Sequence, residues 1–124
     1  MKVLLDTHAL LWWLADDERL SQGARQTILD SDVVVSVVSL WEIEIKRARR
    51  RVEADTAEVL DRVMRVHGFG LIDVRPSHIL ALAELPLLHS DPFDRMLVAQ
   101  ARREGAGLVS RDSSLSSYDI EVYW

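Results

Sequence analysis

Short, continuously apolar runs alternate with longer amphipathic segments along most of the chain. The strongest run, Val33–Val38, is β-branched at almost every position and predicts a strand that is buried on both faces. Lys2–Leu5, Gly70–Val74 and Leu108–Ser110 have a similar composition, and Ile120–Trp124 alternates apolar and polar residues as an edge strand does. The hydrophobic pattern therefore predicts five short strands.

The segments between these runs carry apolar residues at helical spacing, with cap or breaker residues near their ends. Helices are expected over residues 9–14, 21–29, 39–51, 55–66, 76–85 and 91–104. Leu29, Met64 and Val66 are expected on the inward faces of their helices, and the polar residues 113–117 predict a loop. The alternation of strands and helices indicates an α/β sandwich with a largely parallel sheet.

Composition narrows the class of protein. With 124 residues, of which 48% are hydrophobic, we expect one globular domain over residues 1–124. The absence of cysteine excludes a disulfide framework and a thiolate zinc site, and it favours a cytosolic protein. No apolar run approaches the length of a membrane span or a signal peptide, so a soluble protein is expected. A net charge of -5 argues against a general polyanion binder, although a nuclease with a carboxylate metal site is also acidic.

The segment Ser90–Ala101 predicts a helix that begins with two carboxylates. Asp91 before Pro92 has the pattern of an N-cap followed by proline at the first helical position, and apolar residues then follow at helical spacing. The helix dipole favours a further acid in the first turn, but neither the cap nor the dipole requires Asp94. This second acid therefore needs a separate explanation.

Three other acids follow predicted strands. Asp6 comes after the first strand, Glu42 after the second and Asp112 after the fourth, while Asp94 begins the helix that leads into the fourth strand. Ligands of parallel sheets bind beyond the carboxyl ends of the strands. If the first, second and fourth strands are neighbours, the four side chains converge at one edge of the sheet.

Each acid also has a local structural explanation. Asp6 fits a helix cap, and Asp112 fits an Asx turn. Ser39 and Glu42 match a capping box, and Asp91 and Asp94 have the same offset. Taken singly, these explanations are the more common ones. Taken together, carboxylates within about 4–6 Å of one another repel unless a cation lies between them. Oxygen ligands without cysteine or paired histidine favour Mg²⁺ or Mn²⁺, and such an ion supports phosphodiester hydrolysis.

The chain resembles the PIN-domain ribonucleases, and within them the VapC toxins of bacterial toxin–antitoxin pairs. The similarity covers essentially the whole chain and is carried by Val3–His8, Ser39–Ile43, His89–Arg95 and Leu108–Asp112, of which the Asp-Pro-Phe-Asp-Arg block is the most specific. The resemblance implies a five-stranded parallel sheet in the order 3-2-1-4-5 and Mg²⁺- or Mn²⁺-dependent endonucleolytic cleavage of RNA. It also implies a homodimer in a prokaryotic cytoplasm, inhibited by a cognate VapB-type antitoxin whose tail occupies the site.

The four acids of the family correspond to Asp6, Glu42, Asp94 and Asp112 in this sequence. Because all four are present, the resemblance implies an active enzyme that binds its metal through them. Asp6 and Asp94 are the expected direct ligands, and the other two complete the site through water or a second ion. Three neighbouring residues are expected to support these ligands: Thr7, Ser110 and Asp91.

Cations near the acids are candidates for RNA contacts. Lys46, one turn beyond the second acid, begins a basic run through Arg51 that either contacts RNA phosphates or forms a solvated helix face. Arg95, next to the third acid, is placed for substrate or for a salt bridge. Trp12 and Trp13 point about 100° apart on a helix, so either one lies in an interface or the helix is covered on most sides. The four histidines lack metal-ligand spacing and are interpreted as structural or capping.

Two alternatives come from other classes of protein. A phosphoacceptor domain of the receiver type also gathers acids around Mg²⁺, but it needs a lysine late in the chain, and the only lysines are Lys2 and Lys46. A PIN-like domain that binds RNA or a partner without cutting is the other alternative. The complete set of acids counts against it.

Overall fold

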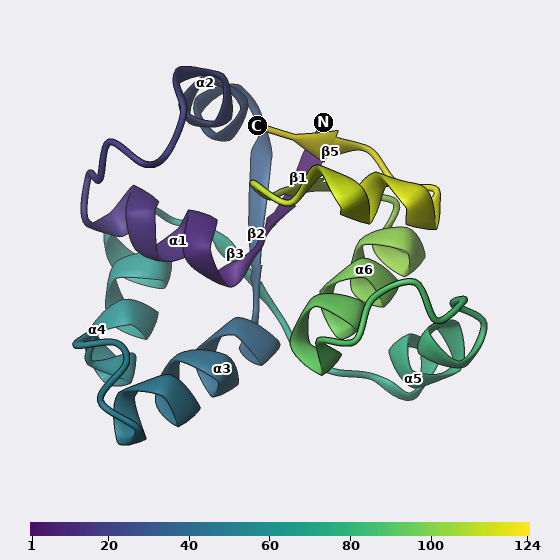
Figure 1. Ribbon diagram of the computed structural model, residues 1–124. Helices are drawn as coiled ribbons and strands as arrows, with labels where there is room; N and C mark the ends of the chain where they lie inside the picture. Colours follow the sequence, from purple (N-terminus) through teal and green to yellow (C-terminus); the bar gives the residue numbers. More distant parts are fainter.

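The computed structural model describes residues 1–124 and has a five-stranded sheet at its centre (Figure 1). The strands are β1 (Lys2–Leu5), β2 (Asp32–Ser36), β3 (Gly70–Ile72), β4 (Gly107–Val109) and β5 (Val122–Tyr123). Their order is β3-β2-β1-β4-β5 and every neighbouring pair is parallel, which confirms the predicted fold class and strand order. A receiver-type domain has the order 2-1-3-4-5, so the topology excludes that alternative.

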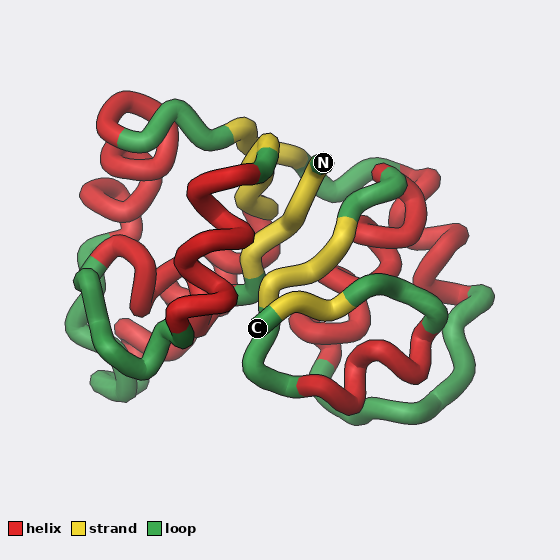
Figure 2. The backbone as a smooth tube through the Cα atoms, turned by 90° about the horizontal axis from the view of Figure 1, so that it is seen from above, coloured by secondary structure: helices red, strands yellow, loops and turns green.

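Helices connect the strands and cover both faces of the sheet. They are α1 (Thr7–Leu14), α2 (Gln22–Asp30), α3 (Val37–Ala48), α4 (Thr56–Asp61), α5 (Pro76–Ala83) and α6 (Pro92–Glu104), with a π-helical turn η1 (Arg62–Val66) and a 3₁₀ helix η2 (Ser113–Tyr118). α1 and α4 lie on one side of the sheet, and α5 and α6 lie on the other (Figure 1). Seen from above, the strands run between two groups of helices (Figure 2). No helix is both long enough and apolar enough to cross a membrane.

Alternate residues of the central strands enter two hydrophobic clusters, one on each side of the sheet. Val3 and Leu5 of β1 belong to the cluster that contains buried residues of α1 and α2, whereas Leu4 belongs to the cluster built on α6. Alternate residues of β2 likewise belong to the two different clusters. Burial on both faces explains why these strands are continuously apolar, and it fixes their register, because a one-residue slip would exchange the two faces. The carboxyl ends of the strands are thereby held at one edge.

Helix α3 begins at Val37, two residues earlier than predicted. Ser36 is its N-cap, and the Ser36 hydroxyl accepts a hydrogen bond from the Val38 N–H at 3.0 Å. The β-branched pair Val37 and Val38 favours a strand, but Val38 is buried in the cluster on the α6 side, and tertiary packing of this kind overrides a weak local propensity. The capping box predicted for Ser39 and Glu42 is therefore wrong.

Smaller differences concern side-chain direction and the ends of elements. Residues 113–117 were predicted to form a loop, but residues 113–118 form η2, in which Leu115 and Tyr118 are buried. Leu29, Met64 and Val66 were expected to face inward and are exposed. Leu29 follows the last buried position of α2 and points away from it, whereas Met64 and Val66 lie in the π-helical turn, whose wider spacing breaks the regular helical period.

Candidate active site

The four predicted acids line one pocket at the carboxyl edge of the sheet. Asp6 follows β1, Asp112 lies just beyond β4, Glu42 lies in α3 after β2, and Asp94 lies in the first turn of α6. They share a pocket of about 480 Å³ in which Trp12 is the one hydrophobic lining residue. Hereafter this is called the acidic pocket. The convergence predicted from the sequence is thus present in the structure.

Asp6 is buried at the junction of β1 and α1. Its carboxylate accepts a hydrogen bond from the Ala9 N–H at 2.8 Å and so caps α1. Burial raises the pKa of this carboxyl, and a hydrogen bond from the Ser110 side chain opposes the shift. Asp6 is therefore both a helix cap and part of the acidic pocket, and Ser110 lies beside it as predicted.

Glu42 is buried and held by partners on both of its oxygens. The Thr7 hydroxyl donates a hydrogen bond to Oε1 at 2.6 Å, and Lys46 Nζ lies 2.6 Å from Oε2. Lys46, which was predicted to contact RNA, does line the acidic pocket. In this structure its charge is balanced by Glu42, which lies one turn earlier on the same helix.

Asp94 differs from the other three acids because its carboxylate accepts no hydrogen bond. Asp91 builds the turn beneath it, since the Asp91 carboxylate accepts from the N–H groups of Phe93 and Asp94 at 2.8 and 3.1 Å, which confirms Asp91 as the N-cap. Burial, together with the negative charges of Asp91, Asp6 and Glu42, raises the pKa of Asp94 to about 6. The ionised form of Asp94 is thus unfavourable, and a cation in the acidic pocket would relieve it.

Asp112 has hydrogen-bond partners on both of its oxygens. The Ser114 N–H and hydroxyl donate to Oδ1 at 3.0 and 2.5 Å, which confirms the predicted Asx turn. His89 Nε2 lies 3.2 Å from Oδ2, and it is 3.8 Å from the carboxylate of Asp94. Hydrogen bonds, from Ser114 first and then from His89, hold the pKa of Asp112 below its ordinary value. From the sequence, His89 was expected to be structural or capping, and its position between two acids was not predicted.

The cations of the site also differ from those predicted. Arg111 lines the acidic pocket, its guanidinium carbon lies 5.9 Å from the ring centroid of Trp12, and it forms no ion pair. Arg95, predicted to bind substrate, lies outside the pocket and donates to the Pro86 carbonyl at 2.8 Å and the Tyr118 hydroxyl at 3.3 Å. Adjacent residues on a helix point about 100° apart, so Arg95 cannot follow the direction of the acid before it.

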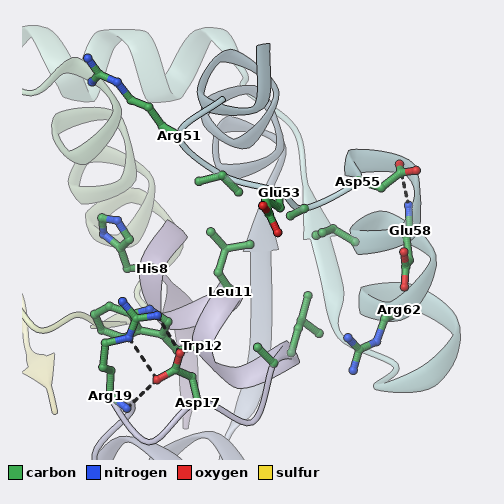
Figure 3. Close-up of a pocket in the computed structure, with 15 residues that line it drawn as sticks. His8, Leu11, Trp12, Asp17, Arg19, Arg51, Glu53, Asp55, Glu58 and Arg62 are labelled. Atoms are coloured by element: carbon green, nitrogen blue, oxygen red, sulfur yellow. Dashed lines mark hydrogen bonds and ion pairs between the residues drawn. The ribbon is translucent and has the colours of Figure 1, made fainter. Parts of the chain in front are cut away.

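A larger groove of about 680 Å³ adjoins the acidic pocket, between α1 and the segment 51–62 (Figure 3). His8 and Trp12 line both the groove and the acidic pocket, and Arg19 lies over the Trp12 ring at 5.1 Å. Trp13 contacts aromatic rings at the end of η1 and the start of β3 instead. The two tryptophans therefore diverge as predicted, and Trp12 is the one that lies at the groove.

The sequence and the fold are both similar to those of known proteins. A sequence model of the PIN domain matches residues 3–121. The chain belongs to the PIN domain family. This PIN domain is also 30% identical over 118 residues to Ribonuclease VapC22 of Mycobacterium tuberculosis, a match that covers 94% of this chain and 91% of that protein.

Solved structures share the fold of this PIN domain at low sequence identity. The crystal structure of VapBC2 from Rickettsia felis bound to a promoter DNA fragment matches with a TM-score of 0.73 and 14% identity, over 98% of this chain and 97% of that chain. VapBC-1 from nontypeable Haemophilus influenzae matches with a TM-score of 0.68 and 12% identity, over 98% of this chain and 96% of that chain. These likenesses support the fold.

Proposed function

We propose that this PIN domain, residues 1–124, is the toxin of a prokaryotic toxin–antitoxin pair and acts in the cytoplasm as a metal-dependent endoribonuclease. The reaction is hydrolysis of RNA phosphodiester bonds. One observation carries the proposal: the four predicted acids line one pocket together with Asp91, and the carboxylate of Asp94 accepts no hydrogen bond that would balance its charge. The similarity to Ribonuclease VapC22 supports RNA as the substrate.

The residues of the acidic pocket fit a hard divalent cation. Their donors are carboxylate oxygens, which Mg²⁺ and Mn²⁺ prefer. We assign Asp6 and Asp94 as direct ligands, with Glu42 and Asp112 completing the site. When bound, such an ion polarises a phosphate oxygen and lowers the pKa of a coordinated water. The hydrogen bond from Thr7 keeps the Glu42 carboxylate turned toward the pocket.

The RNA strand is proposed to enter the acidic pocket past Arg111 and Trp12. Arg111 has no carboxylate partner, so its guanidinium is available for a backbone phosphate, and the adjacent Trp12 ring offers an apolar surface to a nucleotide. Lys46 is a second phosphate contact in this proposal, although Glu42 competes for its charge. Arg47 in the basic run pairs with Glu44, which leaves Arg49–Arg51 as exposed cations on that side.

The proposed partner is a VapB-type antitoxin. This proposal is supported by the two VapBC complexes that share the fold. The groove of Figure 3 is the proposed site for the antitoxin tail, because a chain lying in it would pass His8 and Trp12 and reach the acidic pocket. A homodimer is also proposed, and the exposed apolar side chains of Ile79 and Leu80 on α5 offer a surface that a second copy would cover.

An RNA cleavage assay tests the catalytic proposal. The purified protein is incubated with RNA in Mn²⁺, in Mg²⁺ and in EDTA, beside the variants Asp94→Asn and Asp55→Asn. The second variant is the control, because Asp55 caps α4 outside the acidic pocket and asparagine is as good an N-cap as aspartate. We expect cleavage with either metal, none in EDTA, none with Asp94→Asn and retention of activity with Asp55→Asn.

Two outcomes would contradict parts of this proposal. Cleavage that survives EDTA or Asp94→Asn means that the metal mechanism is wrong. RNA binding without cleavage under every condition identifies the non-catalytic PIN-like domain instead. Expression of the intact protein tests the toxin assignment, because growth arrest that a neighbouring small gene product relieves is expected and harmless expression contradicts it.

A further inference from the structure

His89 makes a different contact with each of its two ring nitrogens. Nδ1 accepts a hydrogen bond from the Asp91 N–H at 3.2 Å. Nε2 lies 3.2 Å from Asp112 Oδ2 and 3.8 Å from Asp94 Oδ2. The imidazole therefore links the segment that precedes α6 to the segment that follows β4, and it does so next to two of the four acids.

The contact at Nδ1 decides which nitrogen carries the ring proton. A backbone N–H can only donate, so Nδ1 of His89 is the unprotonated acceptor. A neutral imidazole carries one ring proton, which then lies on Nε2 and is donated to Asp112. A nitrogen that carries a proton has no lone pair for a cation. The potential ligand atoms of His89, Asp94 and Asp112 lie within 4.8 Å of one another, but in this arrangement His89 is a donor and not a metal ligand.

This donor completes the restraint on Asp112. Ser114 holds Oδ1 of Asp112 and His89 holds Oδ2, so the plane of the carboxylate is fixed from both sides. The restraint matters because the Asp112 side chain is 42% exposed and would otherwise turn toward solvent. Asp6 and Glu42, in contrast, are buried and restrained by their surroundings.

We propose that His89 is a positioning residue that orients Asp112 toward Asp94 for cation binding, an inference that rests on the proposed metal-dependent function. Groups that hydrogen-bond to a metal ligand fix its direction and typically contribute 10- to 100-fold to metal affinity. Asp91 acts on both Asp94 and His89. Its carboxylate caps the turn that carries Asp94, and its N–H fixes the tautomer of the His89 ring. One residue thus sets the geometry of two acids.

Two amide substitutions separate the roles of the two ring nitrogens. In His89→Asn the side-chain oxygen replaces Nδ1 as the acceptor for the Asp91 N–H, but the shorter side chain no longer reaches Asp112. In His89→Gln the amide nitrogen replaces Nε2 as the donor to Asp112. Mn²⁺ binding to the metal-free protein is measured by isothermal titration calorimetry, and thermal unfolding in EDTA reports on the fold. We expect His89→Asn to weaken Mn²⁺ binding about 10-fold or more, with little change in unfolding temperature, and His89→Gln to restore most of the affinity.

A double-mutant comparison tests whether His89 acts through Asp112. In an Asp112→Asn background, His89→Asn should cause no further loss of Mn²⁺ affinity, because the carboxylate that it orients is already absent. Kinetics give a second readout: His89→Asn should lower kcat at limiting Mn²⁺, recover at high Mn²⁺ and leave KM for RNA unchanged.

The outcomes separate this inference from the proposed function. If Asp112→Asn binds Mn²⁺ as tightly as the wild type, the metal site itself is assigned wrongly. If Asp112→Asn loses affinity while His89→Asn retains it, the positioning role is refuted and the metal site stands. Equal losses in His89→Asn and His89→Gln would also overturn the role, because the donor at Nε2 would then not be the cause.

Discussion

Replacing Asp94 with asparagine is expected to stabilise the metal-free protein while abolishing metal-dependent cleavage. The Asp94 side chain is 27% exposed, and its pKa is raised from 3.8 to about 6. The folded protein therefore holds this proton more tightly than the unfolded chain, so ionisation of Asp94 lowers the free energy of unfolding. At roughly 1.36 kcal/mol per pKa unit, the shift corresponds to about 3 kcal/mol. This is an upper value, because the asparagine amide must also be buried.

Urea unfolding in EDTA at several pH values measures this difference. Above about pH 7 the Asp94 carboxyl is ionised in both the folded and the unfolded state, so the whole penalty is present. As the pH falls through about 6 the folded protein takes up the proton first and the penalty shrinks, until it disappears below the unfolded pKa of 3.8. We expect Asp94→Asn to be more stable than the wild type by about 1–3 kcal/mol at pH 7.5 and by roughly a third of that difference at pH 4.5. Mn²⁺ should then raise the stability of the wild type and leave the variant unchanged.

Two results would refute this reasoning: a variant less stable than the wild type at pH 7.5, or a stability difference that does not depend on pH. Asp55→Asn is the control. Asp55 caps α4 through the Ala57 N–H at 2.9 Å, it does not line the acidic pocket, and asparagine caps a helix equally well. Its substitution should change neither the stability nor the response to Mn²⁺.

Three further predictions concern single side chains. Arg111→Gln should raise KM for RNA with little change in kcat, and it should reduce the slope of log affinity against log salt by about one. Arg103→Gln, at an exposed position, should leave KM and the salt slope unchanged, and equal effects of the two substitutions would contradict the phosphate contact. Thr7→Val should cost about 1–3 kcal/mol in urea unfolding, because Glu42 loses its buried donor, and an unchanged stability would mean that Lys46 alone holds this carboxylate. Asp91→Ala should cost about 1 kcal/mol through the lost cap while Asp91→Asn costs little, and an equal loss in both would show that charge and not capping matters.

The strand pattern and the edge where the acids meet could be predicted because both depend on local features. A run that is apolar at every position must be covered on both faces, and in a parallel sheet the residue after such a run lies at the carboxyl edge. Asp6 and Asp112 follow from this rule directly. The order of the strands came from the resemblance to the PIN-domain ribonucleases, since periodicity alone does not say which strands are neighbours.

The remaining features depend on contacts that no local pattern specifies. The start of α3 is set by the burial of Val38 across the sheet, against the strand propensity of its own sequence. The contact of His89 with Asp112 joins residues 23 positions apart, and Arg111 reaches the acidic pocket only because β4 lies beside β1. For Arg95, closeness in the sequence was misleading. It was predicted to lie at the site because it follows Asp94, but the helix turns its side chain toward Tyr118.

Capping and metal binding are compatible roles for the same carboxylate, although from the sequence they compete as explanations. A carboxylate has two oxygens and about four acceptor positions. Asp6 gives one of these positions to the Ala9 N–H, and Asp112 gives Oδ1 to Ser114, and both still line the acidic pocket. A satisfied cap therefore does not count against a metal ligand. The informative acid is Asp94, since no cap, hydroxyl or ion pair within 3.5 Å balances its charge, and burial beside other acids raises its pKa to about 6. A cation would remove the cost of ionising this carboxyl. Asp94→Asn should therefore separate stability from activity more clearly than any other substitution in the pocket.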